Sequence, residues 1–246
     1  MKRKIFVIGD SHTRVLGKAE ELRAQSGDSP SECAFDIHWI LTKKGDKSRG
    51  DMPLEEAVAI VKALGPDDIV VISLAGTLHN IFGLLRHDPP FDFYTADDDD
   101  VESGTEIIPF HAVKDLLYDS ARNNRNIIAI KKAASCRVFH LPTPAPKEDN
   151  EFIQEKTVRY RDRFVLDAGI NSPAIRLKLW ELEMEVVEEL CREWGMSFIP
   201  APLGSQTDAG FLKKDYYGAD ATHANEAYGQ LVLRQLEDIA LGAGAT

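Results

Sequence analysis

The chain has 246 residues, 43% of them hydrophobic, and a formal net charge of -11, which disfavours binding to nucleic acid or to anionic membrane surfaces. Its three cysteines lie far apart without the spacing of a zinc site or a disulfide framework, and we expect no metal or cofactor. No apolar run is long enough for a signal peptide or a membrane helix, so we expect a cytoplasmic protein, with one domain over residues 1–246.

Short apolar runs alternate with longer amphipathic stretches along the chain, which is typical of a parallel sheet covered by helices on both faces. The predicted strands are residues 4–9, 36–41, 68–74, 137–141 and 197–200. The predicted helices are residues 13–25, 54–64, one long helix within 112–134, a helix that Ser172 caps and Pro173 opens, and 225–241. Together these elements predict an α/β fold, a three-layer α/β/α sandwich with a five-stranded parallel sheet.

Two segments interrupt this alternation. Residues 86–105 contain a Pro-Pro pair, an aromatic cluster and an acidic run at 97–100, and they are predicted to form an inserted loop of the kind that often covers a binding site. The acidic run lacks the spacing and the glycine of a calcium loop, so a solvated loop is favoured. Residues 142–171 begin with three prolines and follow the fourth predicted strand, so we expect them near the carboxyl edge of the sheet.

The first predicted strand runs directly into Gly9-Asp10-Ser11-His12, after which a helix begins. Ser11 is therefore expected at the carboxyl edge of the sheet, where open α/β sheets keep their sites, with its hydroxyl near a helix N-terminus. A serine in this position is well placed to act as a nucleophile. The alternative is that Ser11 or Asp10 only caps the helix, and the motif needs a partner to decide between the two.

A candidate partner precedes the last predicted helix, in Asp220-Ala221-Thr222-His223. An aspartate and a histidine three residues apart can turn the same way, so that the carboxylate holds Nδ1 and leaves Nε2 free to accept a hydroxyl proton. Taken alone, the pair is better explained by a capping aspartate beside a surface histidine. Together with a strand-terminal serine at the other end of the chain, it favours a serine hydrolase.

These two motifs resemble those of the SGNH hydrolases, also called GDSL-type esterases. Gly9-Asp10-Ser11-His12 is similar to the family's nucleophile motif, with histidine in place of the usual leucine, and Asp220 and His223 match its Asp-x-x-His. The predicted order of strands and helices agrees over essentially the whole chain. The resemblance implies Ser11 as nucleophile, His223 as general base and Asp220 as its orienting acid, on a flavodoxin-like sheet of order 2-1-3-4-5.

The resemblance also implies an oxyanion hole built from the amide of Ser11, a glycine amide after the second strand and an asparagine side chain after the third. Gly45 is the natural candidate for the glycine, with Gly50 behind it. The third strand is followed by a Gly-Thr-Leu-His-Asn run, in which the asparagine is displaced from the family's spacing. We favour Asn80 as the side-chain donor, with Thr77 as its substitute.

Two further histidines lie beside motif residues. His12 and His79 are candidates to border the substrate pocket, and His79 is a second substitute for the displaced asparagine. A histidine near a strand end is as often only a satisfied polar group.

The expected function is hydrolysis of an acyl ester, O-acetyl esters included, on a small molecule or a carbohydrate, through an acyl-enzyme on Ser11. Acyl transfer and thioester hydrolysis use the same triad and stay open. Because the asparagine is displaced, a binding protein with weak or no catalysis is the alternative from a different class. A nucleotide binder is disfavoured, because no glycine-rich phosphate loop follows any predicted strand. The sequence does not indicate an oligomeric state.

Overall fold

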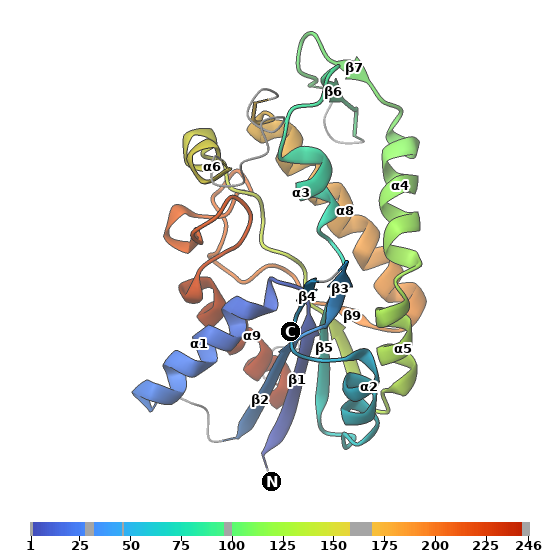
Figure 1. Cartoon of the computed structure of the whole chain (residues 1–246), viewed down its shortest axis with the longest axis vertical. Helices are drawn as coiled ribbons and strands as arrows, with labels where there is room; N and C mark the ends of the chain where they lie inside the picture. The colour runs from blue at the N-terminus through green and yellow to red at the C-terminus, as the bar shows by residue number, and fades with distance from the viewer. Residues whose placement is uncertain (1, 28–31, 46, 96–99, 158–168, 243–246) are drawn as a thin grey trace.

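The computed structural model describes residues 2–27, 32–45, 47–95, 100–157 and 169–242, and at its centre lies a parallel sheet of five strands (Figure 1). The strand order β2-β1-β5-β8-β9 confirms the predicted flavodoxin-like order 2-1-3-4-5. The strands are β1 (Arg3–Gly9), β2 (Cys33–Trp39), β5 (Ile69–Ser73), β8 (Arg137–His140) and β9 (Ser197–Phe198). The main helices are α1 (Thr13–Ser26), α2 (Leu54–Lys62), α4 (Phe110–Arg122), α5 (Arg125–Ala133), α8 (Pro173–Trp194) and α9 (Glu226–Leu241).

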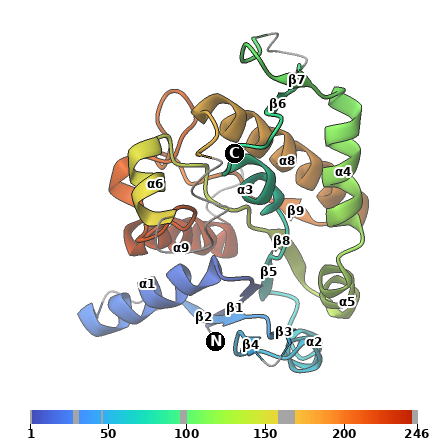
Figure 2. The same cartoon turned by 45° about the horizontal axis from the view of Figure 1, so that its top comes forward.

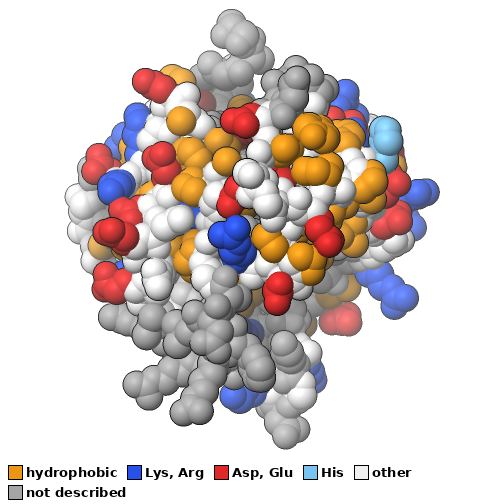
Figure 3. Space-filling model, turned by 90° about the horizontal axis from the view of Figure 1, so that it is seen from above, with side chains coloured by type: hydrophobic (Ala, Val, Ile, Leu, Met, Phe, Trp, Pro, Cys, Tyr) orange, Lys and Arg blue, Asp and Glu red, His pale blue; other side chains and the backbone are white. Residues whose placement is uncertain are grey.

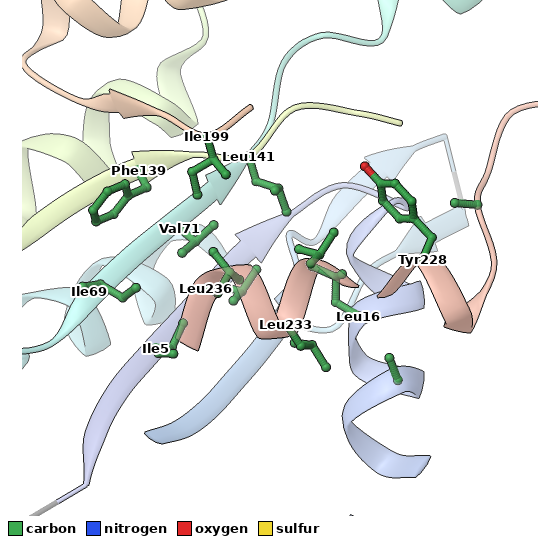
Figure 4. Close-up of a cluster of buried hydrophobic side chains, with 14 of the residues drawn as sticks. Ile5, Leu16, Ile69, Val71, Phe139, Leu141, Ile199, Tyr228, Leu233 and Leu236 are labelled. Carbon is green, nitrogen blue, oxygen red and sulfur yellow. The ribbon is translucent and has the colours of Figure 1, made fainter. Parts of the chain in front are cut away.

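Helices cover both faces of this sheet, which explains why the run of apolar residues in β1 is uninterrupted. Ile5 and Val7 pack with residues of α1 and α9 in the core drawn in Figure 4, whereas Phe6 and Ile8 pack with residues of α2, α5 and α8 in a second core. All four side chains are at most 1% exposed. Because successive side chains of a strand point to opposite faces, a strand that is buried on both sides needs apolar residues at consecutive positions, as β1 has from Ile5 to Ile8.

Shorter elements connect these layers, and they stand mainly above the carboxyl ends of the strands, at the top of Figure 1. Figure 3 views this end of the molecule and shows hydrophobic side chains exposed between charged ones. The elements are β3 (Thr42–Lys44), β4 (Lys47–Arg49), α3 (Leu78–Gly83), β6 (Phe91–Asp92), β7 (Glu106–Ile107), α6 (Asn150–Thr157) and the 3-10 helix η1 (Lys214–Tyr216). None of the described helices combines the length and the apolar character that a membrane span requires.

The ends of α8 and α9 follow local sequence signals. Ser172 Oγ accepts the amide hydrogen bond of Ile175 at 3.4 Å, and Pro173 occupies the first turn, as predicted. Gly195 ends α8 in the left-handed conformation, with φ of 65°. Asn225 caps α9 in the same way as Ser172 caps α8, because its side chain accepts an amide hydrogen bond from the first turn.

The prediction of one long helix within residues 112–134 is wrong, because the chain forms the two helices α4 and α5 there. Asn124 separates them. Its Oδ1 accepts the amides of Asn126 and Ile127 at 3.1 and 3.3 Å, and its Nδ2 donates to the carbonyl of Leu74 at 2.7 Å. An asparagine competes with a helix for backbone partners, so this residue starts a helix instead of continuing one.

The insert at residues 86–105 is more ordered than the loop that the sequence predicts, although residues 96–99 lie outside the described residues. The two strands β6 and β7 pair in parallel. Lys178 of α8 fastens the insert, because its ammonium lies 3.1 Å from Asp92 Oδ1 and donates to two backbone carbonyls of the insert. Both side chains of this ion pair are 6% exposed. Described contacts therefore hold the base of the insert against α8.

His140 at the end of β8 has no exposed surface, and its ring stacks on Phe198. Burial lowers the pKa of His140 to about 4. The unfolded chain takes up this proton near the ordinary histidine pKa of about 6.5, so the unfolded state binds more protons than the folded state between about pH 6.5 and about pH 4. The stability that depends on a neutral His140 is therefore complete above this window and is lost as the pH falls through it.

We expect His140→Phe to flatten the acid side of the stability profile by up to about 1.4 kcal/mol per pH unit between about pH 6 and about pH 4.5. Urea unfolding of both proteins at a series of pH values measures this slope. His111→Phe, at an exposed position of α4, is the control and keeps the wild-type slope. Equal slopes for the wild type and His140→Phe would contradict the burial argument.

Candidate active site

Ser11 lies in the turn between β1 and α1, at the carboxyl edge of the sheet and beside the positive end of a helix. The turn requires glycine at position 9, because a Cβ on Gly9 would lie 2.3 Å from Thr13 Cγ2 and 2.6 Å from the carbonyl oxygen of Ser73. The amide of Asp10 donates to that same carbonyl at 3.0 Å. Close backbone contact with β5 thus fixes the two residues that precede the serine.

The fold brings Ser11 to His223, which lies 212 residues further along the chain. Ser11 Oγ is 2.8 Å from His223 Nε2, and His223 Nδ1 is 2.8 Å from Asp220 Oδ2. A carboxylate only accepts hydrogen bonds, so Nδ1 carries the proton and the lone pair of Nε2 faces the serine hydroxyl. In this arrangement an imidazole can remove a proton from a hydroxyl group.

Asp220 stays ionised in this arrangement. Burial raises the pKa of its carboxyl, but hydrogen bonds from the His223 side chain and from the amides of His223 and Thr222 outweigh burial and hold the pKa well below its usual range. The two amides donate to Asp220 Oδ1 at 2.8 and 2.9 Å, while Oδ2 is left for the imidazole. The carboxylate is therefore oriented by its own loop before it orients His223.

That loop is tight. Tyr217 pairs with Ala224 at its base, and the amide of Gly218 donates to the carbonyl of His223 at 2.9 Å. A Cβ on Gly218 would lie 2.5 Å from the carbonyl oxygens of His223 and Ala224, so the loop closes only over a glycine.

A buried lysine, which sequence reasoning missed, supports this loop from the protein interior. Lys147 is 2% exposed, and its ammonium donates to the carbonyl of Gly218 at 3.2 Å and to the carbonyl of Asp220. Burial lowers the pKa of Lys147 to about 8, against the opposing effect of Asp220, and nearby Lys156 acts in the same direction as burial. No sequence signal could have found this residue, because its partners are backbone carbonyls 71 and 73 residues away.

His12 lies against the imidazole of His223, with the two ring centroids 4.4 Å apart. Burial, together with the positive fields of His223 and His79, lowers the pKa of His12 to about 3. The His12 ring is therefore uncharged near neutral pH. When His223 becomes an imidazolium, it meets no second positive charge from this neighbour.

His79 is 2% exposed and belongs to the first turn of α3, where it meets a buried glutamate that sequence reasoning also missed. Glu183 of α8 accepts His79 Nδ1 at 2.7 Å and the amides of Leu78 and His79 at 3.0 and 2.8 Å. Glu183 thus holds the start of α3. The sequence did contain a signal for Glu183. This residue lies four positions from both Leu179 and Val187, which places it on the buried face of the helix, where a carboxylate needs hydrogen-bond partners.

The residues predicted to form the oxyanion hole occupy different places. The Ser11 amide has no hydrogen-bond acceptor among the described residues, and Thr77 lines a cavity of about 270 Å³ together with Asp10. Gly45 is exposed in the turn between β3 and β4, and Asn80 lies inside α3, and neither residue lines that cavity. The roles predicted for Gly45 and Asn80 gain no support from these positions.

A larger cavity of about 580 Å³ opens beside Ser11 and His223. Its walls come from α1, from α6 and from the loop before α9, and Figure 2 shows these three elements on one side of the molecule. No group of three or more metal-ligating side chains is gathered within the described residues. We call the cavity beside Ser11 and His223 the α1–α6 cavity. Its other lining residues include Arg14, Lys18, Phe152, Lys156, Tyr217 and Glu226.

No family model matches the chain, and no curated protein matches its sequence. Solved structures do match. The periplasmic domain of a lipopolysaccharide acetyltransferase from Salmonella ser. Paratyphi A has a TM-score of 0.52 at 14% identity, over 98% of this chain and 84% of that one.

Two further solved structures are similar over nearly the whole chain. A GDSL-like lipase from Bacteroides thetaiotaomicron has a TM-score of 0.44 at 10% identity, over 98% of this chain and 89% of that one. An extracellular lipase from Streptomyces rimosus has a TM-score of 0.46 at 12% identity, over 95% and 99%. At identities this low, the comparisons show a similarity of fold alone. The chain has a flavodoxin-like α/β fold that it shares with the acetyltransferase domain, and its Gly-Asp-Ser and Asp-x-x-His motifs resemble those of the SGNH hydrolases.

Proposed function

We propose that the chain is a serine ester hydrolase in which Ser11 is the nucleophile, His223 the general base and Asp220 the orienting acid. The observation that carries the proposal is the pair of 2.8 Å contacts that joins the three side chains. A capping role for either motif explains neither contact, because a cap needs only backbone amides.

In the proposed reaction, Ser11 Oγ bonds to the ester carbonyl carbon while His223 Nε2 takes the hydroxyl proton. The carbonyl electrons move onto oxygen, and their return breaks the bond to the alcohol, which leaves with the proton from His223. Water, deprotonated by His223, then attacks the acyl-enzyme and releases the acid and the serine. Asp220 stays ionised throughout and stabilises the imidazolium, while the neutral ring of His12 adds no repulsion.

We further propose that the Ser11 amide and the Thr77 hydroxyl hold the carbonyl oxygen as it becomes negative. Thr77 follows β5 at the same sheet edge as Ser11, and it shares a cavity with Asp10, the residue before the nucleophile. This favours the substitute donor Thr77 over Asn80, which lies inside α3 and does not line that cavity.

The acyl group that we propose is small, an acetyl group included, on a small molecule or a carbohydrate. The alternative is acyl transfer to a second alcohol, which the similarity in fold to the acetyltransferase domain suggests. The two reactions share the acyl-enzyme and differ only in whether water or an alcohol accepts the acyl group. Adding glycerol or a free sugar as acceptor, and measuring the acylated alcohol, separates them.

Loss of the nucleophile tests the proposal. We expect the wild type to react with a fluorophosphonate probe and to hydrolyse 4-nitrophenyl acetate, while Ser11→Ala loses labelling and its kcat falls by at least about 10³-fold. His223→Ala lowers kcat similarly, because no other described group accepts the hydroxyl proton. Ser197→Ala, exposed in β9, is the matched control and keeps both activities. A wild type that neither reacts with the probe nor hydrolyses the ester would support the binding-protein alternative.

The side-chain oxyanion donor is tested by a second pair of variants. We expect Thr77→Val to lower kcat by about 10²-fold with little change in KM, because the hydroxyl acts only on the charge that develops in the transition state. Asn80→Leu changes kcat by less than about threefold. The reverse result, with the larger loss in Asn80→Leu, would return the role to the asparagine.

Support of the loop by Lys147 is tested in the same assay. We expect Lys147→Met to lower kcat by at least about tenfold, because two backbone carbonyls lose their donor and the Asp220–His223 loop loses its fixed position. Circular dichroism checks that the variant is folded, and Lys132→Met, exposed at the end of α5, is the control. Wild-type kcat in a folded Lys147→Met protein would show that the loop holds its shape without this lysine.

A further inference from the structure

The α1–α6 cavity gathers positive charge in a chain whose net charge is -11. Arg14 and Lys18 line it from α1, and Lys156 lines it from α6. The carboxylates among its lining residues are Asp220, which is committed to the imidazole of the base, and Glu226, which pairs with Lys18 at 3.3 Å. Arg14 and Lys156 therefore have no carboxylate partner among the described residues that line the cavity.

Neither of these two cations is neutralised inside the cavity. Arg14 forms no ion pair with the residues that the structure describes, and its guanidinium lies 5.7 Å from the centre of the Trp39 ring. Lys156 pairs with Glu155 at 3.1 Å, but the Glu155 side chain is 71% exposed and the Lys156 side chain only 19%. Water therefore screens the carboxylate of that pair far more than the ammonium.

Aromatic rings between cations form another part of the wall. Phe152 and Tyr217 line the cavity, and the buried ammonium of Lys147 lies 4.7 and 5.0 Å from the centres of their rings. The ammonium of Lys156 lies 5.2 Å from the centre of Phe152. After burial, the charge of Lys156 is one of the causes that lower the pKa of Lys147, so the two ammonium groups act on each other. A negative charge in the cavity would relieve this repulsion.

We propose that the ester taken by this site carries a negatively charged group, a carboxylate or a phosphate, which binds in the α1–α6 cavity against Arg14 and Lys156. The inference rests on the proposed function and deepens it by naming the charge of the substrate. Phe152 and Tyr217 in the cavity wall contact the uncharged part of the same molecule, and Ser11 and His223 in the same wall reach its ester bond.

Two esters of nearly equal shape test the proposal, 3-acetoxybenzoate and the neutral 3-acetoxybenzamide, with 3-acetoxyphenyl phosphate as a second anion. We expect wild-type kcat/KM to favour at least one anion over the amide by about tenfold, which corresponds to about 1.4 kcal/mol. In the double variant Arg14→Gln/Lys156→Gln, we expect the ratio of kcat/KM for the anion to kcat/KM for the amide to fall to about 1. Lys62→Gln/Lys132→Gln removes the same charge at exposed positions of α2 and α5, and keeps the preference. Raising the salt concentration weakens the wild-type preference as well.

Two results would overturn the inference and leave the proposed function standing. One is equal kcat/KM for the anions and the amide in the wild type, and the other is a preference that survives in Arg14→Gln/Lys156→Gln. If the wild type hydrolyses none of these esters, binding decides the inference, and the proposed function fails only if the wild type neither reacts with the fluorophosphonate probe nor hydrolyses 4-nitrophenyl acetate. Calorimetric titration with 3-hydroxybenzoate and 3-hydroxybenzamide then supports it if only the anion binds and the double variant loses that binding. Equal binding of both compounds refutes it.

Discussion

The close contact between α1 and α9 is the constraint on which the site depends. At Gly229 a Cβ would lie 2.8 Å from the Cβ of Ala19 and 2.8 Å from the carbonyl oxygen of Val15, so the two helices approach to a separation that only glycine permits. Glycine inside a helix costs about 1 kcal/mol relative to alanine, and here the packing of two helices offsets that cost. Ser11 precedes α1 and His223 precedes α9, so this packing carries the two ends of the chain to hydrogen-bonding distance.

The sheet could be predicted from the sequence because its signals are local. An uninterrupted apolar strand needs cover on both faces, and alternation of such strands with amphipathic stretches leaves few arrangements of the sheet. The caps at Ser172 and Asn225 are also local, since each acts on amides within its own first turn. Asn124 is also a local capping signal. Because the amphipathic pattern continues on both sides of it, the sequence predicted one helix where the structure has α4 and α5.

The surroundings of the triad could not be predicted in the same way. Lys147 and Glu183 act on backbone groups that are distant in sequence, and no periodicity records such a partner. For Thr77 and Asn80, the sequence offered two donors a few residues apart, and only the start of α3 separates a loop position from a helical one. Burial of polar groups is decided by the tertiary fold, whereas motif spacing is decided along the chain.

One helix carries two buried anchors, and this has a mechanical consequence. Lys178 and Glu183 are separated by five positions of α8, about 7.5 Å along a stiff rod. The first holds the insert through Asp92, and the second holds the beginning of α3, directly after Thr77. A displacement of the insert is therefore coupled through α8 to the start of α3, and so to Thr77 at the end of β5. The position of Asp92, at the root of the insert, is therefore tied to the alignment of the reacting groups.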